Sequence, residues 1–474
     1  MSTILDNKLN KQKCQKFTPL ETVTEMLDLA GYTCGLYGRS VLENSFGSGN
    51  ILAEIVIRYI NDGLSSGLSP QNIADGLAND VYGVELDREL YATCIARLEK
   101  IIEEHGIPSV KWSLFNKNAL TWECDKRFDY IIGNPPYITY KDMDEDSRRT
   151  LRENFDTCAD GKFDYCYAFI ERGVKLLSQT GKLVQLVPAN IYKNVFGHNL
   201  RNLLLPHISY IKEYPDKKLF DGTLTSSTIF LYDNSCQTAN IEYENTTFDR
   251  KLSIARTSLG DKWVFLDQEQ SIEKTVRFGD CFHASIVVAT LLNEAFLLPP
   301  ENERERNIEA TVIRRAASPK KMRKKTKEYI IFPYFYIGNE LQRYAPEEFE
   351  QQFPIAAAHL ETFRTKLDER DIDENIHWFE YGRTQALKRL NQPKLLISTV
   401  ITNKAEVYEL DAETVPYSGI FITVKKDGYT LSQAKQILQD SRFTQYVKSL
   451  GISVSGKSKR ITCKDVNNYR FIKE

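Results

Sequence analysis

The chain has 474 residues, of which 42% are hydrophobic and 27% are charged, and its formal net charge is −2. This length and composition predict a globular protein of two or three domains with sizeable cores, and they argue against disorder, collagen and coiled-coil arrays. There is no run of about 18 apolar residues, which excludes a transmembrane helix and a membrane partner.

The nine cysteines are scattered, and none forms a Cys-x-x-Cys pair. The pattern predicts free thiols in a reducing cytoplasm and no structural zinc site. The first 16 residues carry four lysines with no apolar core after them, which is not the pattern of a secretory signal.

The charges are divided unevenly along the chain. Residues 1–250 carry 27 Lys and Arg and 34 Asp and Glu, whereas residues 251–474 carry 35 and 30. An acidic half that handles a small molecule and a basic half that meets nucleic acid would fit this division. Two ordinary solvated surfaces would fit it as well, so the charge alone leaves both interpretations open.

The first half alternates short apolar runs with helical patterns. Apolar residues recur at helical spacing over residues 52–60 and 90–101. Strands that alternate with helices predict an α/β fold with a doubly wound, mostly parallel sheet. We expect its strands at residues 40–43, 81–85, 111–115, 129–133, 182–187, 209–214 and 227–232.

Beyond residue 235 this alternation fades. Residues 314–327 hold eight basic residues and no acidic one, and Ser318-Pro319 argues against one helix through all of them. A second basic stretch lies at residues 457–460. The change of pattern places one domain over residues 1–240 and a second over residues 241–474.

Two acids end neighbouring strands of the predicted sheet. Glu43 ends the first strand, and Gly47 and Gly49 form a turn before the next helix, where backbone N–H groups favour an anionic ligand. Glu85 ends the second strand, where a carboxylate can accept hydrogen bonds from ribose hydroxyls. Each feature alone also fits an ordinary strand–helix turn or a helix cap, but the two together favour a bound nucleoside cofactor.

The sharpest motif follows the fourth strand and reads Asn134-Pro135-Pro136-Tyr137. Two prolines fix the backbone and remove two N–H donors, and Asn134 is extended because it precedes a proline. The turn therefore presents acceptors, the Asn134 side-chain oxygen and the Pro135 carbonyl, beside a flat aromatic ring. This arrangement suits the exocyclic amino group of a planar base. A rigid turn that merely ends a strand is the alternative.

The order of these motifs resembles that of gamma-type DNA adenine-N6 methyltransferases of type II restriction–modification systems. In that family the cofactor motifs come first and a target-recognition domain follows. The resemblance covers residues 17–235 and continues more loosely beyond them. It implies a Rossmann-like, seven-stranded class I fold dependent on S-adenosyl-L-methionine (SAM), followed by a mixed α/β target-recognition domain. It also implies SAM as cofactor, no metal, double-stranded DNA as partner and a nucleoid-associated location.

The resemblance assigns a role to each motif. Phe17-Thr18-Pro19 resembles the motif that covers the methionine end of the cofactor, and Asn118-Ala119 stands where the family contacts the cofactor adenine. The cofactor-binding residues implied are Phe17, Thr18, Pro19, Glu43, Asn44, Ser45, Gly47, Gly49, Glu85, Leu86, Asn118, Ala119 and Phe169. The catalytic residues implied are Asn134, Pro135, Pro136 and Tyr137, and Tyr137 and Phe220 are implied to stack on the target base.

Two positions depart from the family pattern. The glycine-loop motif usually reads Asp-Pro-Ala, where this chain has Glu43-Asn44-Ser45, so an acid is retained. The third motif usually has Asp where this chain has Asn118. An amide oxygen still accepts a hydrogen bond, but the charge-assisted part is lost.

The predicted chemistry needs a flipped base and a protein surface that holds DNA. Adenine in a duplex cannot reach such a turn unless it leaves the stack. Basic side chains predicted to contact DNA phosphates are Arg314, Arg315, Lys320, Lys321, Arg323, Lys324, Lys325 and Lys327. Arg383 and Gln385 have the chemistry to read base edges. The alternatives are a solvated loop for the basic run and a structural signature for residues 378–385.

Other substrates and roles share the tetrapeptide. Enzymes that methylate glutamine in release factors, or an exocyclic amine of ribosomal RNA, also present a planar amide or amine to it. The long second half favours DNA over both. Sixteen residues before the first motif leave no room for a nuclease domain, so we expect any restriction endonuclease to be separately encoded. A DNA-binding homologue that has lost its activity is the remaining alternative.

Overall fold

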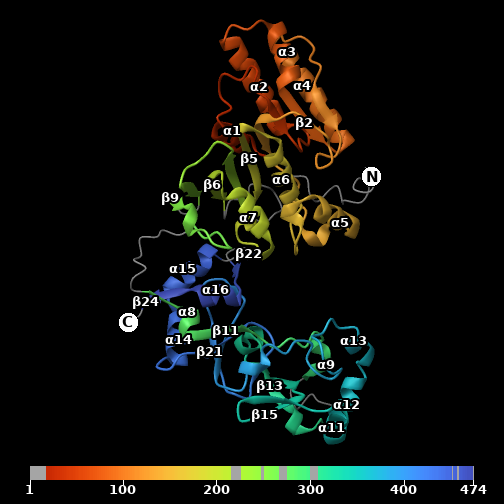
Figure 1. Ribbon diagram of the computed structural model, residues 1–474, viewed down its shortest axis with the longest axis vertical. Coiled ribbons are helices and arrows are strands. Elements are labelled where there is room, and N and C mark those ends of the chain that lie inside the picture. Colours follow the sequence, from red (N-terminus) through yellow and green to blue (C-terminus); the bar gives the residue numbers. More distant parts are fainter. Residues whose placement is uncertain are drawn as a thin grey trace. The chain divides into compact units, whose positions relative to one another are not determined.

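The computed structural model describes residues 18–214, 226–246, 250–265, 275–298, 308–450, 452–455 and 458–472. The chain divides into two compact units, Met1–Asp267 and Gln268–Glu474 (Figure 1). The division lies beyond the predicted boundary at residues 240–241, because the two strands that follow this point still pair with the sheet of the first unit. Among the described helices, none has both the length and the apolar character that crossing a bilayer requires.

The first unit is built on a sheet of nine described strands in the order β3-β2-β1-β4-β5-β7-β6-β8-β9. Strands β3, β2, β1, β4 and β5 run parallel, and β7 is antiparallel to both of its neighbours. The strands are β1 Val41–Glu43, β2 Val81–Glu85, β3 Ser113–Asn116, β4 Phe128–Gly133, β5 Leu177–Pro188, β6 Ile208–Tyr214, β7 Ser227–Asp233, β8 Asn240–Asn245 and β9 Arg250–Ala255. The seven predicted strands are confirmed, and β8 and β9 extend the sheet.

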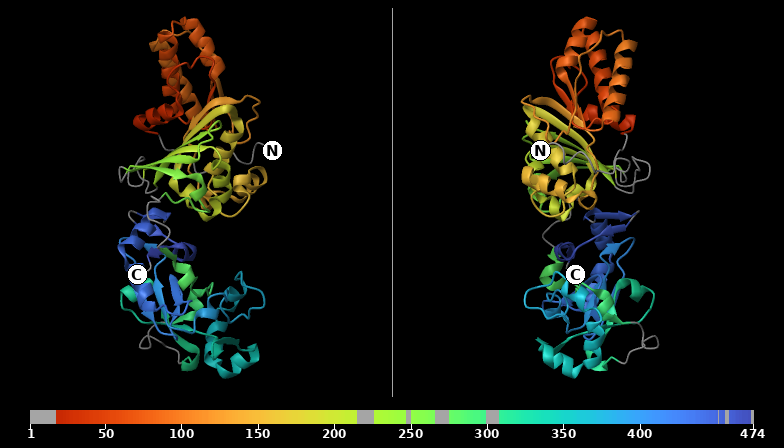
Figure 2. Two further views of the ribbon diagram at one scale, coloured as in Figure 1. Left: turned by 60° about the vertical axis from the view of Figure 1, so that its left-hand side comes forward. Right: turned by 90° about the vertical axis from the view of Figure 1, so that its right-hand side faces the viewer.

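Helices cover both faces of this sheet, which two further views show (Figure 2). Adjacent strand residues point to opposite faces, so Ile131 packs in one core and Ile132 in the other. On the Ile132 side lie α1 Leu20–Ala30, α2 Asn50–Ser65, α3 Pro70–Asp80 and α4 Arg88–Glu104. On the Ile131 side lie α5 Glu145–Asn154, α6 Cys166–Leu176 and α7 His198–Leu204. The doubly wound arrangement is confirmed.

Local signals explain where the helices near the sheet edge begin. Gly49 caps α2 with a φ of +82°, a left-handed conformation that glycine adopts without strain. Asp87 caps α4, because its carboxylate accepts from the backbone N–H groups of Glu89 and Leu90 at 2.9 and 3.3 Å. Helix α2 therefore starts after the glycine turn that follows Glu43, and α4 starts three residues beyond Glu85.

The second unit is a mixed α/β domain, as the sequence predicts. Two four-stranded sheets form its centre, ordered β11-β21-β17-β19 and β12-β14-β13-β20. Its strands are β10 Thr275–Arg277, β11 Phe282–Ile286, β12 Leu297–Leu298, β13 Ile313–Ala317, β14 Glu328–Ile331, β15 Tyr334–Ile337, β16 Glu340–Arg343, β17 Lys394–Ile397, β18 Val400–Ile401, β19 Val407–Leu410, β20 Val415–Pro416, β21 Ile420–Val424, β22 Ile452–Ser455, β23 Ser458–Arg460 and β24 Arg470–Ile472. Its helices are α8 Phe278–Cys281, α9 Asn293–Phe296, α10 Pro319–Arg323, α11 Pro346–Gln352, α12 Pro354–Glu361, α13 Arg364–Asp368, α14 Leu431–Gln439, α15 Ser441–Leu450 and α16 Cys463–Asn468.

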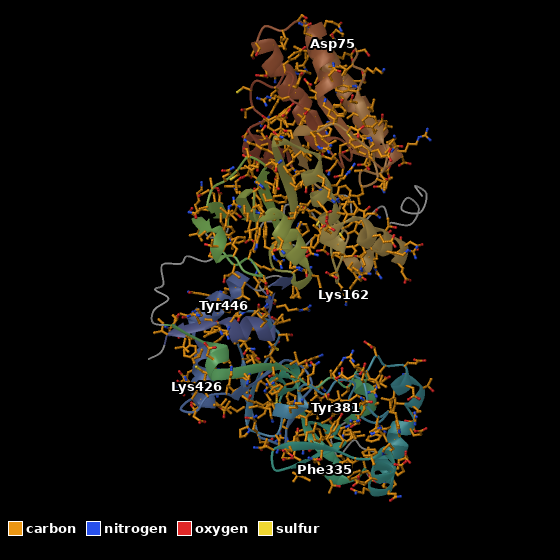
Figure 3. The ribbon with its side chains drawn as sticks, viewed as in Figure 1. Asp75, Lys162, Phe335, Tyr381, Lys426 and Tyr446 are labelled. Atoms are coloured by element: carbon orange, nitrogen blue, oxygen red, sulfur yellow. The ribbon has the colours of Figure 1, made fainter. Side chains whose placement is uncertain are left out.

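A buried aromatic cluster organises the core of the second unit. Tyr381, labelled in Figure 3, is fully buried, and its hydroxyl donates to the Ile331 carbonyl at 2.7 Å. The Tyr381 ring packs edge-on against Phe296 and Tyr334. Because Tyr381 belongs to the 378–385 run, that run contributes directly to the packing of this unit.

Candidate cofactor and catalytic site

The carboxyl ends of β2, β1 and β4 meet at one edge of the sheet, because these strands are neighbours and parallel. Glu85 ends β2, Glu43 ends β1, and Asn134 follows the last residue of β4. Ligands of open α/β sheets bind outside such carboxyl ends. The topology therefore places the two predicted cofactor acids next to the predicted catalytic turn.

Glu85 is bound to the glycine turn through its carboxylate. Glu85 Oε2 accepts from the Gly47 N–H at 2.8 Å, and Oε1 accepts from the Asp87 N–H at 2.8 Å. Burial raises the pKa of Glu85, and these two N–H groups oppose the rise. Since the side chain of Asp87 caps α4, Glu85 does not serve as that helix cap and faces the glycine turn instead.

Gly49 lets the glycine turn pack closely against α4. A Cβ added at Gly49 would stand 2.3 Å from Cys94 Sγ, and the φ of Gly49 is also positive. A Cβ at Gly47, which also has a positive φ, would meet nothing within 4 Å. The two glycines of this motif therefore serve different needs: Gly47 shapes the backbone, and Gly49 also provides the space.

Glu43 and Asn44 form a buried polar group with unused hydrogen-bonding capacity. Each is 2% exposed, and within the described residues Glu43 Oε2 and both side-chain amide atoms of Asn44 have no hydrogen-bond partner. Burial raises the pKa of Glu43 well above its ordinary value, and the nearby charge of Glu85 adds to the rise. Buried polar atoms without partners are rare in folded proteins and indicate a site for a polar ligand.

The predicted catalytic turn, residues 134–137, is in contact with two of the predicted cofactor segments. Asn134 Nδ2 donates to Thr18 Oγ1 at 3.1 Å, and Ser45 Oγ donates to the Asn134 carbonyl at 3.4 Å. Asn44 Oδ1 lies 3.3 Å from where a Cβ on Gly133 would stand. The structure thus brings together the three motifs, at residues 18–19, 43–49 and 134–137, that the sequence singled out.

Tyr137 lies partly buried beside the core on the α1 side of the sheet. Burial raises the pKa of its hydroxyl well above the ordinary value, and a hydrogen bond with the Ser227 side chain opposes the rise. Ser227 begins β7, the strand next to β5. Sequence reasoning missed Ser227, because a serine at the start of a strand carries no local signal of its partner.

The remaining predicted cofactor residues differ in their exposure and in their contacts. Asn118 lies two residues beyond the end of β3, and its Oδ1 accepts from the Leu120 N–H at 3.0 Å, which closes a local turn. Ala119 is buried, and Leu86 is 39% exposed. Phe169 is buried in α6, with its ring 5.5 Å from that of Tyr165. The predictions for Phe17 and Phe220 lie outside the described residues.

A further polar pair, Asp164 and Asn190, follows the predicted catalytic turn on the α6 side. Asp164 Oδ2 accepts from Asn190 Nδ2 at 3.0 Å, and burial raises the pKa of Asp164. Tyr165, the residue after Asp164, donates its N–H to the carbonyl of Ile138 at 2.9 Å. Ile138 is the residue that follows Tyr137. The sequence offered a weak signal here, since both residues fall in segments covered by the family resemblance.

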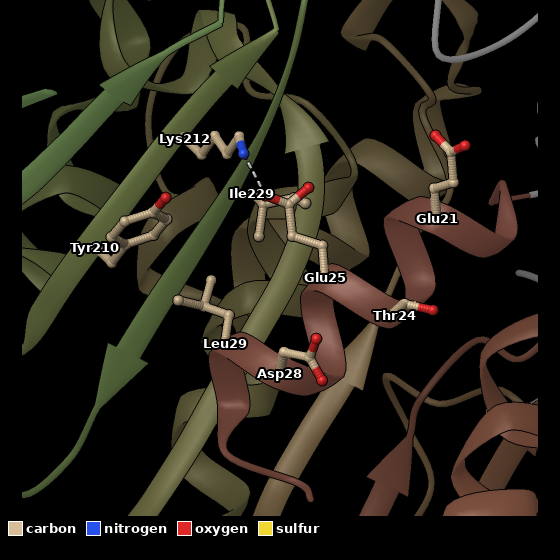
Figure 4. Close-up of a pocket in the computed structure, with 8 residues that line it drawn as sticks. All are labelled: Glu21, Thr24, Glu25, Asp28, Leu29, Tyr210, Lys212 and Ile229. Atoms are coloured by element: carbon tan, nitrogen blue, oxygen red, sulfur yellow. Dashed lines mark hydrogen bonds and ion pairs between the residues drawn. The ribbon is translucent and has the colours of Figure 1, made fainter. Parts of the chain in front are cut away.

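A pocket lies between α1 and strands β6 and β7, and Figure 4 shows its lining. Within it, Lys212 Nζ pairs with Glu25 Oε1 at 2.5 Å, and it also pairs with Glu244 Oε1 at 3.0 Å. The Tyr214 hydroxyl donates to the second oxygen of Glu25. These contacts fasten α1, the helix that begins directly after Thr18-Pro19, to the sheet.

The basic run of the second unit is not a single surface. Arg314 has a side chain only 14% exposed, its guanidinium lies 3.9 Å from the centroid of the Phe332 ring, and it pairs with Glu413 at 3.4 Å. We therefore revise the prediction for Arg314, whose contacts are those of a structural residue. Arg315, Lys320, Lys324, Lys325 and Lys327 are exposed.

Two other members of the run are held in ion pairs within the unit. Lys321 pairs with Glu328 at 2.8 Å, and Arg323 pairs with Glu406 at 2.9 Å. The run also contains a short helix, α10, which starts at Pro319. Its N-cap is Ser318, whose hydroxyl accepts from the Lys321 N–H. No helix continues through the whole run, as the Ser-Pro pair predicts.

Arg383 and Gln385 differ in their environments. Arg383 pairs with Asp371 at 2.9 Å and with Asp373 at 3.2 Å, whereas Gln385 is exposed. Glu380 in the same run is fully buried and is held by Arg343. These contacts favour the structural interpretation of residues 378–385.

Known proteins similar to this chain are restriction–modification methyltransferases, the class of protein that the sequence motifs resemble. Residues 77–220 match the family described as Eco57I restriction-modification methylase. The chain is 29% identical over 215 residues to the type II methyltransferase M.BstVI of Geobacillus stearothermophilus, which covers 42% of this chain and 38% of that protein. It is 24% identical over 328 residues to the type II restriction enzyme and methyltransferase RM.Eco57I of Escherichia coli. This match covers 58% of this chain and 33% of that protein. The chain therefore spans less than two fifths of the length of these curated relatives.

Among solved structures, the type IIL restriction-modification enzyme MmeI in complex with DNA matches with a TM-score of 0.57 at 14% identity. The match covers 95% of this chain and 64% of that chain. This match shows a shared fold, in which a doubly wound, mostly parallel sheet is followed by a mixed α/β domain. The family match and the curated relatives confirm the resemblance of this chain to DNA methyltransferases of type II restriction–modification systems.

Proposed function

We propose that this protein is a site-specific DNA methyltransferase that transfers a methyl group from SAM to the N6 amine of a flipped-out adenine. The observation that carries the proposal is the contact of the Asn134 turn with both cofactor segments at one sheet edge. A turn rich in acceptors suits an amine, and an adjacent buried polar group suits the cofactor.

The residues at the edge of the sheet fit SAM. In this proposal Glu43 and Asn44 offer buried acceptors and donors to the polar methionine end. Glu85 accepts from ribose hydroxyls through the lone pairs that its bonds to the Gly47 and Asp87 N–H groups leave available. When bound, SAM supplies an electrophilic methyl group on a positively charged sulfur. Ionised acids beside that positive charge are favourable, so cofactor binding lowers the raised pKa values of Glu43 and Glu85.

Acceptors on the tetrapeptide would activate the target amine. The lone pair of the N6 amine is delocalised into the adenine ring, which makes the nitrogen a poor nucleophile. The Asn134 side-chain oxygen and the Pro135 carbonyl accept hydrogen bonds from the two N6 hydrogens, localise the lone pair and stabilise the positive charge that develops on nitrogen. That charge is released when one of these hydrogens leaves as a proton after the transfer. Orienting the amine in line with the methyl group supplies much of the rate.

The aromatic ring of the turn and the exposed basic residues serve DNA binding in this proposal. Tyr137 stacks on the flipped base, and such stacking contributes roughly 1–3 kcal/mol per base. Lys320, Lys324 and Lys325 are exposed and neutralise phosphates, which makes binding depend on salt. A separately encoded restriction endonuclease would be the functional partner.

The test is transfer of labelled methyl from SAM to unmethylated genomic DNA, followed by nucleoside analysis. We expect N6-methyladenine with the wild type and none above background with Asn134→Ala, while SAM still binds. Asn154→Ala is the matched control, since Asn154 is an exposed asparagine on α5 whose side-chain amide donates to the Thr150 carbonyl of the same helix. Label on cytosine would refute the adenine assignment, and label in RNA or protein only would refute the DNA assignment.

A further inference from the structure

The side-chain amide of Asn134 has a defined neighbour on its nitrogen side. Its Nδ2 donates to Thr18 Oγ1 at 3.1 Å, so the nitrogen edge faces Thr18 and the oxygen edge is turned away from it. Thr18 is 5% exposed, so water does not compete strongly for this hydrogen bond. An amide turned over would present an N–H where the target amine needs an acceptor.

Thr18 is itself firmly held. Its carbonyl accepts from Asn50 Nδ2 at 3.3 Å, and Asn50 Oδ1 accepts from Arg97 at 2.6 Å. Helix α1, which begins two residues later, is fastened to β6 through Glu25 and Lys212. The hydroxyl that meets Asn134 is therefore part of a rigid support built from three helices and the sheet.

The main chain of Asn134 is held independently. Ser45 Oγ donates to the Asn134 carbonyl at 3.4 Å from the glycine turn. Thr18 thus acts on the orientation of the amide plane, and Ser45 acts on the position of the backbone. Removing the Thr18 hydroxyl would free the amide to rotate without displacing the turn.

We propose that Thr18 is a positioning residue, which orients the Asn134 amide so that its oxygen faces the target amine. This inference rests on the proposed function and revises the role that the family resemblance implies for Thr18, which is contact with the cofactor. A positioning role predicts a slower methyl-transfer step with cofactor and DNA affinity preserved. A cofactor-contact role predicts weaker SAM binding instead.

The test compares Thr18→Val, which keeps the shape and removes the hydroxyl, with Thr18→Ser, which keeps the hydroxyl. Thr24→Val on α1 is the matched control, because Thr24 lines the pocket beside β6 and β7 and, within the described residues, its side chain makes no hydrogen bond to the Asn134 turn. The readouts are the single-turnover rate of methyl transfer to unmethylated genomic DNA and the Kd of SAM without DNA. We expect Thr18→Val to slow transfer about tenfold, which is the size of effect that one lost hydrogen bond produces.

The remaining expected results are a SAM Kd within about twofold of wild type for Thr18→Val, a near-wild-type rate for Thr18→Ser, and no effect of Thr24→Val. An unchanged rate for Thr18→Val, or a weakened SAM Kd at an unchanged saturating rate, would overturn the positioning role. If Thr18→Val does not fold, Thr18→Ala removes the same hydroxyl and the same comparison applies. Failure of the proposed function is distinct, because the wild type would then transfer no methyl to DNA.

Discussion

Replacing Gly49 with alanine tests the close packing of the glycine turn against α4. Gly49 has a φ of +82°, and an added Cβ would stand 2.3 Å from Cys94 Sγ, 3.2 Å from its Cβ and 3.6 Å from its Cα. The left-handed backbone costs an alanine about 1–2 kcal/mol. Overpacking a filled site costs about 1–3 kcal/mol more. We expect Gly49→Ala to lower the free energy of unfolding of the first unit by about 2–5 kcal/mol.

Gly47→Ala separates the two contributions. Gly47 also has a positive φ, of +53°, but an added Cβ would meet nothing within 4 Å. Gly47→Ala should therefore cost only the backbone part, about 1–2 kcal/mol. Cys94→Ala in the Gly49→Ala background should recover most of the overpacking part, because it removes the sulfur and leaves a contact at 3.2 Å.

The assay is urea unfolding of the wild type, the three single variants and the Gly49→Ala/Cys94→Ala double variant. A double-mutant cycle isolates the coupling between the two sites. We expect a favourable coupling of about 1–3 kcal/mol, which equals the overpacking part. Equal losses for Gly49→Ala and Gly47→Ala, together with no coupling to Cys94, would refute the argument that space rather than φ distinguishes Gly49.

Three further predictions concern charged residues, two inside the fold and one exposed. Burial tends to raise the pKa of Glu171, but hydrogen bonds from Lys175 and from backbone N–H groups outweigh burial, so the pKa is lowered. The stability that Glu171→Gln removes should therefore be fully present above about pH 4.5 and should disappear as the pH falls through the lowered pKa. Urea unfolding of both proteins at several pH values measures this difference. A loss that grows toward low pH would contradict the sign. Arg314→Lys should destabilise the second unit by about 1–2 kcal/mol, because a lysine cannot stack on Phe332 in the same way, and leave the salt dependence of DNA binding unchanged. Lys324→Ala should leave the stability of the second unit unchanged and should make DNA affinity depend less steeply on salt concentration. A loss of stability with an unchanged salt dependence would instead mean that Lys324 is a structural residue.

Local sequence patterns predicted the fold of the first unit well. Seven strands fall within a few residues of their expected positions, because each is a short apolar run bounded by turn residues. The strand β2 was predicted at its observed bounds, Val81–Glu85. The extra strands β8 and β9 were missed, because strands in an added edge hairpin give a weaker pattern than buried parallel ones.

The sequence predicts candidate site residues where a short stretch of chain carries the chemistry. Asn134 stands in a proline-rich turn whose stiffness is a property of the covalent chain itself. Arg314 shows the opposite case, because a basic run predicts a charged surface but does not tell which member lies against an aromatic ring. Asp164 and Asn190 were missed for a related reason, since they meet only after the sheet has formed.

The amino-acid sequence by itself determined the parallel sheet, the glycine turn, the acids that end β1 and β2, and the rigid Asn134 turn, because each depends on residues close together in the chain. Only the tertiary structure decided that Thr18 meets Asn134, 116 residues away, and that Gly49 must make room for Cys94. Periodicity and turn chemistry are short-range, whereas these contacts depend on how strands and helices pack. Side-chain partners across such distances follow from the packing of the whole unit and leave no local pattern in the sequence.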